Sequence, residues 1–447
     1  MEQIRTQRAS QRALCIAALP EGEDLAELGE LLRTAGVAVV GELIQRRVQA
    51  HPNTYLGPGK VREAKEAAHA CDANLIACDD ELSPRQERNL EEALGLPVVD
   101  RTAIILDIFA DHAASAEGKL QVELAQLEYN LARMRGLWSH LERLGGGIGT
   151  RGPGESQIET DRRLARNRIA ALRRRLEHVK GTRAVQRAER ERAALPTIAL
   201  VGYTNAGKST LMNALTARFA GAGHTSAHAN GSANGHGTGN GHGNGAGAQV
   251  SVRDRLFHTL DPTVRTLKLS GRRYLLSDTV GFIRKLPHQL IDAFGATLEE
   301  TRRADLLVHV LDASAREPEM EAMRRSVQET LQEIGADERP RLLVLNKVDL
   351  LDGPAREELR TNHPDAVLVS GQTGAGLQQL GERIERELAH TLRPVDLLVP
   401  YANGGSLAEL HELAGEIARQ DTPEGVRVRA LVPARIAERF ARFAVAS

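Results

Sequence analysis

Short apolar runs alternate with amphipathic stretches from residue 12 to about residue 110. Four of these runs have the length and composition of strands, at residues 13–19, 37–40, 74–78 and 97–100. Between them, leucines recur at helical spacing after residue 24, and residues 83–94 show the same helical period. Alternating strands and helices are typical of a parallel sheet, so we expect an N-terminal α/β domain over residues 1–118.

The pattern changes at residue 119, where apolar residues begin to recur in alternating steps of four and three. They are Leu120, Leu124, Leu127, Leu131, Met134, Trp138 and Leu141. A 3.5-residue repeat is typical of a coiled-coil helix. A glycine-rich segment at residues 145–154 ends this repeat, and a second helical stretch follows at residues 155–191. Residues 119–194 are therefore expected to form an antiparallel helical hairpin with the glycines at its tip.

Buried strands return after residue 195. They are expected at residues 197–201, 273–277, 306–312, 341–345 and 367–369. This spacing predicts a second α/β domain over residues 195–391. Within it, residues 220–248 are mostly Gly, Ala, Asn and His, a composition that cannot bury a core, so we expect this insertion to be disordered.

The last part of the chain reads as a small α+β domain over residues 392–447. It contains an apolar run at residues 397–401, a helical stretch from Ser406 to Arg419, and an alternating stretch at residues 426–432. Nothing in this segment indicates a function.

Composition narrows the class of protein. The chain has 447 residues, 41% of them hydrophobic, which is enough for several cored domains. Its three cysteines form no metal-binding pair, and no apolar run approaches the roughly 20 residues of a membrane-spanning helix. We expect a cytoplasmic monomer without a membrane span, with peripheral attachment to the membrane as the alternative.

Charge is concentrated in the second helix of the expected hairpin. Residues 160–192 contain twelve lysines and arginines against four acidic residues, a net charge of +8, while the whole chain carries −1. A helix this basic is stabilised by an adjacent polyanion, and nucleic acid is the common one. The alternative is a solvated helix face. Few aromatic residues are available for base stacking, so recognition of phosphates and shape is expected.

The clearest chemical motif follows the strand at residues 197–201. It reads G-x-x-x-x-G-K-S and consists of Gly202, Tyr203, Thr204, Asn205, Ala206, Gly207, Lys208 and Ser209. Strand, glycine-rich loop and helix is the context of a phosphate-binding P-loop, whose main-chain N–H groups surround phosphate oxygens. Lys208 is expected to reach the β- and γ-phosphates as a catalytic group, and the Ser209 hydroxyl to bind Mg²⁺.

Two later segments have the composition of switch loops. The first is Phe257, His258, Thr259, Leu260 and Asp261, and the second is Asp278, Thr279, Val280 and Gly281. Thr259 is expected to complete the Mg²⁺ shell only when a γ-phosphate is present. Asp278 ends a strand and is placed to hold Mg²⁺ directly or through water, and the Gly281 N–H to contact the γ-phosphate.

Base choice is indicated by an N-K-x-D motif after the strand at residues 341–345. It consists of Asn346, Lys347, Val348 and Asp349. The Asp349 carboxylate can accept hydrogen bonds from guanine N1–H and the 2-amino group, neither of which adenine offers, so GTP is expected over ATP. A final loop, Ser370, Gly371 and Gln372, is expected over the base and is a loose version of the usual S-A-K pattern.

Two weaker features leave alternatives open. Gly57 to Lys60 opens a helix and could cradle a second phosphate, or it is a plain turn. The histidines of the 220–248 insertion could bind a metal, or belong to a merely flexible tract.

These motifs, together with residues 145–155 and 53–60, resemble the HflX family of ribosome-associated bacterial GTPases over nearly the whole chain. The resemblance implies an N-terminal α/β domain, a helical hairpin, a Ras-like GTPase domain with a mostly parallel sheet and helices on both faces, and a small C-terminal domain. It also implies binding to the large ribosomal subunit and GTP-dependent splitting of stalled 70S ribosomes under stress. The residues then expected to contact ribosomal RNA are Gly145, Gly146, Gly147, Thr150, Arg151, Gly152, Arg162, Arg163 and Arg166.

One position bears on the rate of hydrolysis. Many GTPases have a water-orienting glutamine after the glycine of the second switch, but this chain has Phe282, which cannot hydrogen-bond water. Slow intrinsic hydrolysis and strong stimulation by the large subunit are therefore expected. The rival hypothesis is a GTP-gated binding module with little turnover, either an anti-association scaffold or a metal chaperone using the histidine-rich insertion.

Overall fold

The computed structural model describes residues 11–20, 24–47, 49–134, 153–193, 195–219, 256–257, 263–285, 287, 290, 295–415 and 417–445, and the structural statements below concern these ranges. Side chains are described for part of the long helix only, at residues 159–179. Three sets of predicted features lie outside the described residues: the glycine-rich hairpin tip, the insertion at residues 220–248, and His258 to Asp261 of the first switch.

A four-stranded parallel sheet forms the centre of the N-terminal region, in the spatial order β2-β1-β3-β4. Its strands are β1 (Arg12–Leu19), β2 (Ala38–Arg46), β3 (Leu75–Cys78) and β4 (Val98–Asp100), and its helices are α2 (Ala26–Thr34), α3 (Pro58–Ala70), α4 (Pro84–Leu94) and α5 (Arg101–His112). Alternate residues of β1 face opposite sides: Cys15 packs with α2 and α5, and Ile16 packs with α3 and α4. The predicted parallel sheet is confirmed.

Local sequence explains where these helices begin and end. α4 starts at a capping box, because the Ser83 hydroxyl accepts from the Gln86 N–H and the Gln86 side chain accepts from the Ser83 N–H. It ends at Gly95, whose φ of 73° lies in the left-handed region that favours glycine. Asp100 caps α5 in the same way, accepting from the Ala103 N–H.

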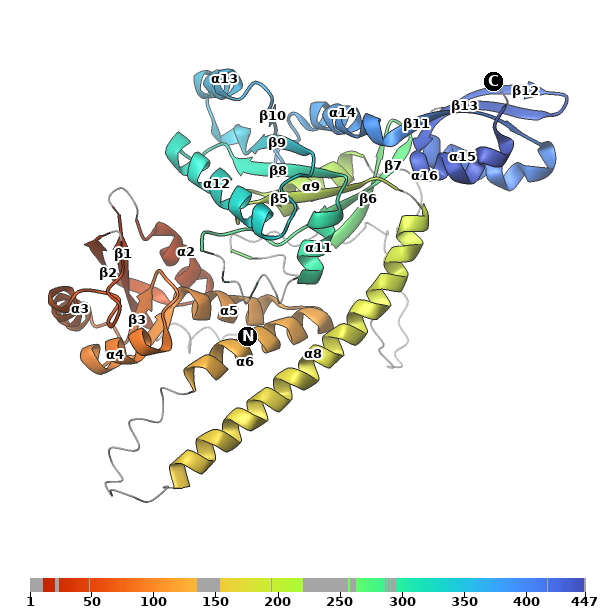
Figure 1. The fold of residues 1–447 in the computed structure, drawn as a ribbon. Helices are drawn as coiled ribbons and strands as arrows, with labels where there is room; N and C mark the ends of the chain where they lie inside the picture. Colours follow the sequence, from red (N-terminus) through yellow and green to blue (C-terminus); the bar gives the residue numbers. More distant parts are fainter. Residues whose placement is uncertain are drawn as a thin grey trace, which may run out of the picture.

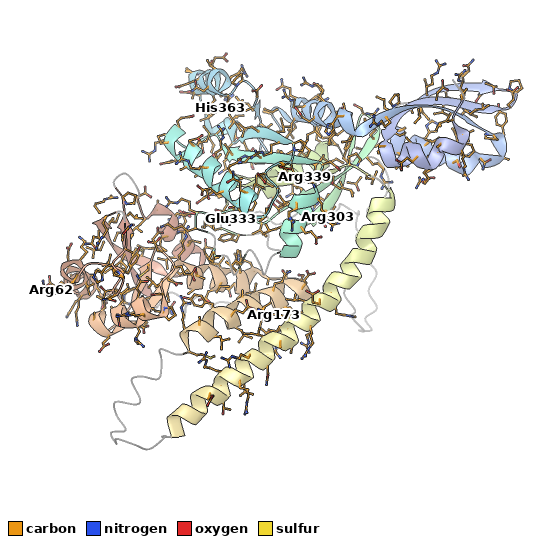
Figure 2. All side chains as sticks on the ribbon, viewed as in Figure 1. Arg62, Arg173, Arg303, Glu333, Arg339 and His363 are labelled. Carbon is orange, nitrogen blue, oxygen red and sulfur yellow. The ribbon has the colours of Figure 1, made fainter. Side chains whose placement is uncertain are left out.

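Two antiparallel helices, α6 (Ala116–Arg133) and α8 (Pro153–Ala193), connect the N-terminal region to the next domain. Figure 1 shows α8 crossing α6 and continuing far beyond it toward the second sheet. Leu124 of α6 packs against Ile169, Leu172 and Leu176 of α8, as the coiled-coil repeat predicts. Outside this seam, Arg173 pairs with Glu128 at 2.8 Å where the helices cross (Figure 2).

The second domain contains a six-stranded sheet in the order β10-β9-β8-β5-β7-β6, parallel except for the edge strand β6. Its elements are β5 (Thr197–Gly202), α9 (Lys208–Arg218), β6 (Thr263–Leu269), β7 (Arg272–Asp278), α11 (Gly295–Arg303), β8 (Leu306–Asp312), α12 (Glu317–Glu333), β9 (Arg341–Asn346), α13 (Gly353–Asn362), β10 (Val367–Leu368) and α14 (Leu377–Leu388). Leu211 of α9 and Ile384 of α14 pack on one face of the sheet, and Val327 of α12 packs on the other. The mostly parallel P-loop domain is confirmed, and β6 is a strand that sequence reasoning missed.

The second face of this sheet shares one hydrophobic core with the N-terminal region. The same continuous cluster of buried residues contains Leu28 of α2 and Phe109 of α5 together with Phe282 and Leu331 of the second domain. In Figure 1 the N-terminal sheet lies below α12, with α2 on the side of the sheet toward α12. The nucleotide-binding motifs are therefore built next to a domain interface.

The C-terminal region is a three-stranded antiparallel sheet in the order β11-β13-β12, covered by two helices. Its elements are β11 (Leu392–Val399), α15 (Gly404–Ala414), β12 (Ile417–Thr422), β13 (Gly425–Pro433) and α16 (Ala434–Phe440). The helix predicted from Ser406 to Arg419 is wrong at its end. Gly415 has a φ of 73° and stops the helix, and the residues from Ile417 pair with β13 as a hairpin strand.

Candidate functional site

The P-loop is formed where β5 turns into α9, as the motif predicts. Gly207 has a φ of 86°, and a Cβ atom placed there would lie 2.4 Å from Asn346 Nδ2. Asn346 Nδ2 donates to the Ala206 carbonyl at 2.9 Å. The loop can thus approach the N-K-x-D motif this closely only because position 207 lacks a side chain.

Lys208 is buried at the first turn of α9. Its Nζ donates to the carbonyl oxygens of Gly202 at 3.0 Å and Tyr203 at 2.8 Å, inside the curve of the loop. Burial lowers the pKa of Lys208 to about 8, and the nearby Asp278 carboxylate opposes this shift. A desolvated ammonium group inside a ring of peptide groups fits an anionic ligand such as a phosphate chain.

Ser209 in the first turn of α9 lies beside Asp278, the last residue of β7. Asp278 ends β7, which pairs with β5 in parallel with Leu200 opposite Asp278, and Ser209 Oγ donates to Asp278 Oδ2 at 2.6 Å. A hydroxyl and a carboxylate beside a phosphate-binding loop are the oxygen ligands that Mg²⁺ prefers. The donor set therefore fits Mg²⁺, which Ser209 and Asp278 would help to hold.

The second switch lies directly against the P-loop. A Cβ atom on Gly281 would lie 2.8 Å from Thr204 Cγ2 and 3.1 Å from Lys208 Nζ. The next residue, Phe282, donates its N–H to the Gly202 carbonyl at 3.1 Å and accepts from the Thr204 N–H at 2.8 Å. Its side chain is buried in the interdomain core, so no polar group occupies the position of a water-orienting glutamine.

The base-recognition residues also converge. Asn346 Oδ1 accepts from the Gly371 N–H at 3.0 Å, which places the loop at residues 370–372 beside the N-K-x-D motif. Asp349 Oδ1 is buried and has no hydrogen-bond partner among the described residues. Because a buried carboxylate oxygen without a partner is costly, this atom fits a ligand that donates hydrogen bonds, as guanine does. Lys347 is turned toward Asp312, at 2.7 Å.

Other predicted contacts have different surroundings. Thr279 Oγ1 donates to the Leu200 carbonyl at 2.6 Å, and Val280 and Val348 are buried. The Phe257 ring lies against Phe109 of α5 and is turned into the interdomain core. These side chains support the loops, and any nucleotide contact from them comes from the main chain.

Known proteins were compared with this chain. Residues 22–110 and 112–190 match the models of the N-terminal and middle regions of GTP-binding GTPases, and residues 197–236 and 244–347 match the model described as 50S ribosome-binding GTPase. "GTPase HflX" of Caldanaerobacter subterraneus is 44% identical and aligns with 98% of this chain and 95% of its own length. The Escherichia coli "GTPase HflX" is 46% identical over 83% of this chain and 82% of its own.

The chain belongs to the HflX family of GTPases. It is accordingly a GTP-binding enzyme that hydrolyses GTP. A crystal structure of a GTP-binding protein from Sulfolobus solfataricus with GDP is 25% identical and covers 85% of this chain and 99% of its own, with a TM-score of 0.39. Among the described residues of this HflX-family chain, no helix has an apolar stretch long enough to cross a membrane.

Sequence reasoning missed the ionic network behind the site. Glu27 of α2 accepts hydrogen bonds from the P-loop Tyr203 hydroxyl and, at 2.8 Å, from Arg284 Nε just after the second switch. Arg101 of α5, 1% exposed, lies 2.9 Å from Glu27 and 2.8 Å from Asp79. These residues are far apart in the chain, and no local motif marks them.

The same network sets the charge of Glu27. Burial alone would raise its pKa, but the Arg101 charge and the bonds from Tyr203 and Arg284 bring the pKa below the ordinary value. Lys285 continues the network, because its Nζ lies 3.0 Å from Asp79 Oδ2 and also pairs with Asp80. The P-loop and the segment after the second switch are thus both attached to carboxylates of the N-terminal region.

Protonation of Lys208 predicts a pH dependence of nucleotide binding. Phosphates stabilise the ammonium form, so the pKa rises in the complex. The affinity for GDP should be nearly constant below pH 8 and fall up to about tenfold per pH unit above it. Fluorescent GDP titrated between pH 7 and 9 measures this. Lys208→Arg keeps its charge over that range, so its weaker affinity should show no such slope; an equal slope in both proteins would contradict the assignment.

Proposed function

We propose that this HflX-family GTPase binds the large ribosomal subunit and uses its GTP cycle to split or rescue stalled or stress-damaged 70S ribosomes. The match of residues 197–236 and 244–347 to 50S ribosome-binding GTPases supports the partner. The connection between the nucleotide site and the basic helix α8 supports the proposal that GTP hydrolysis is coupled to the splitting of ribosomes.

The observation that carries the proposal is the continuity of α8 with the P-loop strand. α8 has 41 residues, about 60 Å of helix, and ends only a few residues before β5. Its inner side packs on α6, whereas Arg163, Arg166, Arg174 and Arg175 are exposed. A polyanion bound along the outer side of α8 would therefore contact a helix that is joined, through β5, to the phosphate-binding loop.

Ribosomal RNA is the polyanion proposed for this surface. Arg163 and Arg166 offer exposed guanidinium groups, and Arg162 beside them is partly buried. The glycine-rich tip, with Gly145, Gly146, Gly147, Thr150, Arg151 and Gly152, lies beyond the described residues and is proposed to enter the subunit. Contacts of this kind recognise phosphates and shape and give strong salt dependence.

Within the nucleotide site, the proposed roles are those that the motifs predict, and Thr259 lies outside the described residues. Lys208 binds the β- and γ-phosphates, Ser209 and Thr259 hold Mg²⁺ with Asp278 acting directly or through water, and Asp349 accepts from guanine. When bound, Mg²⁺ neutralises phosphate charge. Because Phe282 is buried and apolar, the chain supplies no side chain there to orient water, and the ribosome is proposed to supply or order the missing group. The protein would act as a cytoplasmic monomer.

Loss of the exposed arginines should weaken ribosome binding. The triple variant Arg163→Ala, Arg166→Ala and Arg174→Ala is expected to bind 50S subunits more weakly and to lower the slope of log affinity against log salt by about 0.7–0.9 for each lost phosphate contact. Cosedimentation over a salt series measures both quantities.

The matched control removes three exposed arginines elsewhere on the GTPase domain: Arg325→Ala, Arg356→Ala and Arg360→Ala, on α12 and α13. It loses the same positive charge but leaves α8 intact, so it should bind like the wild type. If both triple variants lose the same affinity, only the net charge matters and α8 is not the RNA-binding surface.

A further inference from the structure

Leu256 and Phe257, just before the first switch, lie in the core of the N-terminal region. The Phe257 ring meets Phe109 of α5 edge-on, with ring centroids 4.6 Å apart, and is 3% exposed. The Leu256 N–H donates to Thr34 Oγ1 at the end of α2, at 3.3 Å, and the Leu256 side chain is 7% exposed. Two residues of the GTPase domain are thus seated between the helices of another domain.

The backbone at this point also departs from its preferred conformation. Phe257 has a φ of 57°, in the left-handed region that a bulky aromatic residue seldom adopts. Such a conformation persists only where the surroundings determine it, and here the aromatic contact and the Leu256 hydrogen bond do so. The position of Phe257 is therefore set by the N-terminal region.

Leu256 and Phe257 lie between two segments of the chain, the switch residue Thr259 on one side and a long tract on the other. Thr259 follows two residues later, within about 7 Å of extended chain. Before Leu256 comes a tract of residues 220–255, of which residues 220–248 are rich in Gly, Ala, Asn and His. The other end of this tract is anchored at Phe219, whose carbonyl accepts from the Lys268 N–H at 3.1 Å. The equilibrium constant for closing a loop between two fixed ends falls only about threefold for each doubling of the loop length.

We propose that Leu256 and Phe257 form a clip that seats the start of the first switch on the N-terminal region, with Phe257 as a positioning residue for Thr259, and that the clip isolates Thr259 from the tract at residues 220–255. The inference rests on the role of Thr259 proposed above. Changes in the length or composition of the tract should then leave the position of Thr259 unaltered, because Leu256 and Phe257 are held by the N-terminal region.

The test is the Mg²⁺ dependence of nucleotide retention, measured in each nucleotide state and without ribosomes. Dissociation of mant-GMPPNP and of mant-GDP is followed from the full-length protein over a Mg²⁺ titration. Phe257→Ala should raise the Mg²⁺ concentration needed to retain mant-GMPPNP about tenfold, as loss of a support behind a metal ligand does. Retention of mant-GDP should be unchanged, because Thr259 is expected to bind Mg²⁺ only with a γ-phosphate.

A general loss of stability would affect both states alike, and this outcome would overturn the proposal. Phe257→Leu retains an apolar group, so its Mg²⁺ requirement for mant-GMPPNP should be close to that of the wild type. Phe219→Ala, at the opposite end of the tract, should leave this Mg²⁺ requirement unchanged. Deletion of residues 222–249 should also leave it unchanged within about twofold. A deletion that shifts the Mg²⁺ requirement as far as Phe257→Ala would overturn the isolation of Thr259.

The variant Thr259→Ala distinguishes a failure of the proposed clip from a failure of the proposed role of Thr259. If Thr259→Ala shifts the GMPPNP state and Phe257→Ala does not, the clip is wrong while the role of Thr259 stands. If Thr259→Ala has no effect, the proposed switch role fails and the clip fails with it.

Discussion

Asp349→Asn should turn this GTPase into an enzyme that prefers xanthosine triphosphate. The wild-type carboxylate accepts two hydrogen bonds from guanine, each to a charged group and each contributing about 1.5–3 kcal/mol, so GTP affinity should fall about 10²- to 10⁴-fold. Xanthine carries an oxygen where guanine carries the 2-amino group. The asparagine amide can donate to that oxygen while its carbonyl accepts from N1–H, so the new pair is satisfied.

Competition of GTP and XTP for a fluorescent guanine nucleotide or its xanthine counterpart measures this exchange. Asp352→Asn is the matched control, since Asp352 lies three residues away and caps α13 by accepting from the Ala355 N–H at 2.9 Å. Asparagine caps helices about as well as aspartate, so this variant should keep both stability and GTP preference. Undiminished GTP binding by Asp349→Asn would show that the base is recognised elsewhere.

Lys208→Ala should reduce GTP turnover about 10²- to 10³-fold, the usual effect of removing one preorganised group that faces developing charge. The structure gives the reason, because the Lys208 ammonium is buried within the P-loop, where it donates to the carbonyl oxygens of Gly202 and Tyr203. Nucleotide affinity should fall as well, since the lysine contacts ground-state phosphates.

Phosphate release measured with and without 50S subunits gives the turnover of this variant. Lys268→Ala removes an exposed lysine from β6 of the same domain and should leave both rates unchanged. A Lys208→Ala protein that retains more than a tenth of wild-type turnover would contradict the assigned role.

Local signals in the sequence were sufficient for most of the fold and for the strand ends that carry the proposed nucleotide site. The P-loop and the N-K-x-D motif each follow a short apolar strand, and parallel strands bring their carboxyl ends to one edge of a sheet. The two motifs therefore meet in space, and Asn346 Nδ2 donates to the Ala206 carbonyl oxygen at 2.9 Å. The leucine repeat likewise predicted the α6 side of the α6–α8 seam, where Leu124 packs against Leu172.

Other elements depend on contacts that no local pattern records. β6 was missed because Thr263 to Leu269 follow a switch loop and only two of the seven residues are fully buried, as an edge strand allows. The helix predicted through Arg419 ended early because a hairpin partner, β13, outweighs the helical spacing. Glu27 accepts hydrogen bonds from Tyr203 and Arg284 only because two domains dock, a tertiary event that joins residues far apart in the chain.

The central claim is that the large ribosomal subunit activates this enzyme through its basic helix. The most direct measurement is GTP turnover with and without purified 50S subunits over a salt series. The account predicts slow turnover alone, stimulation by up to several orders of magnitude with 50S subunits, and loss of that stimulation as salt rises. Turnover that is fast alone, or that 50S subunits leave unchanged at every salt concentration, would contradict it.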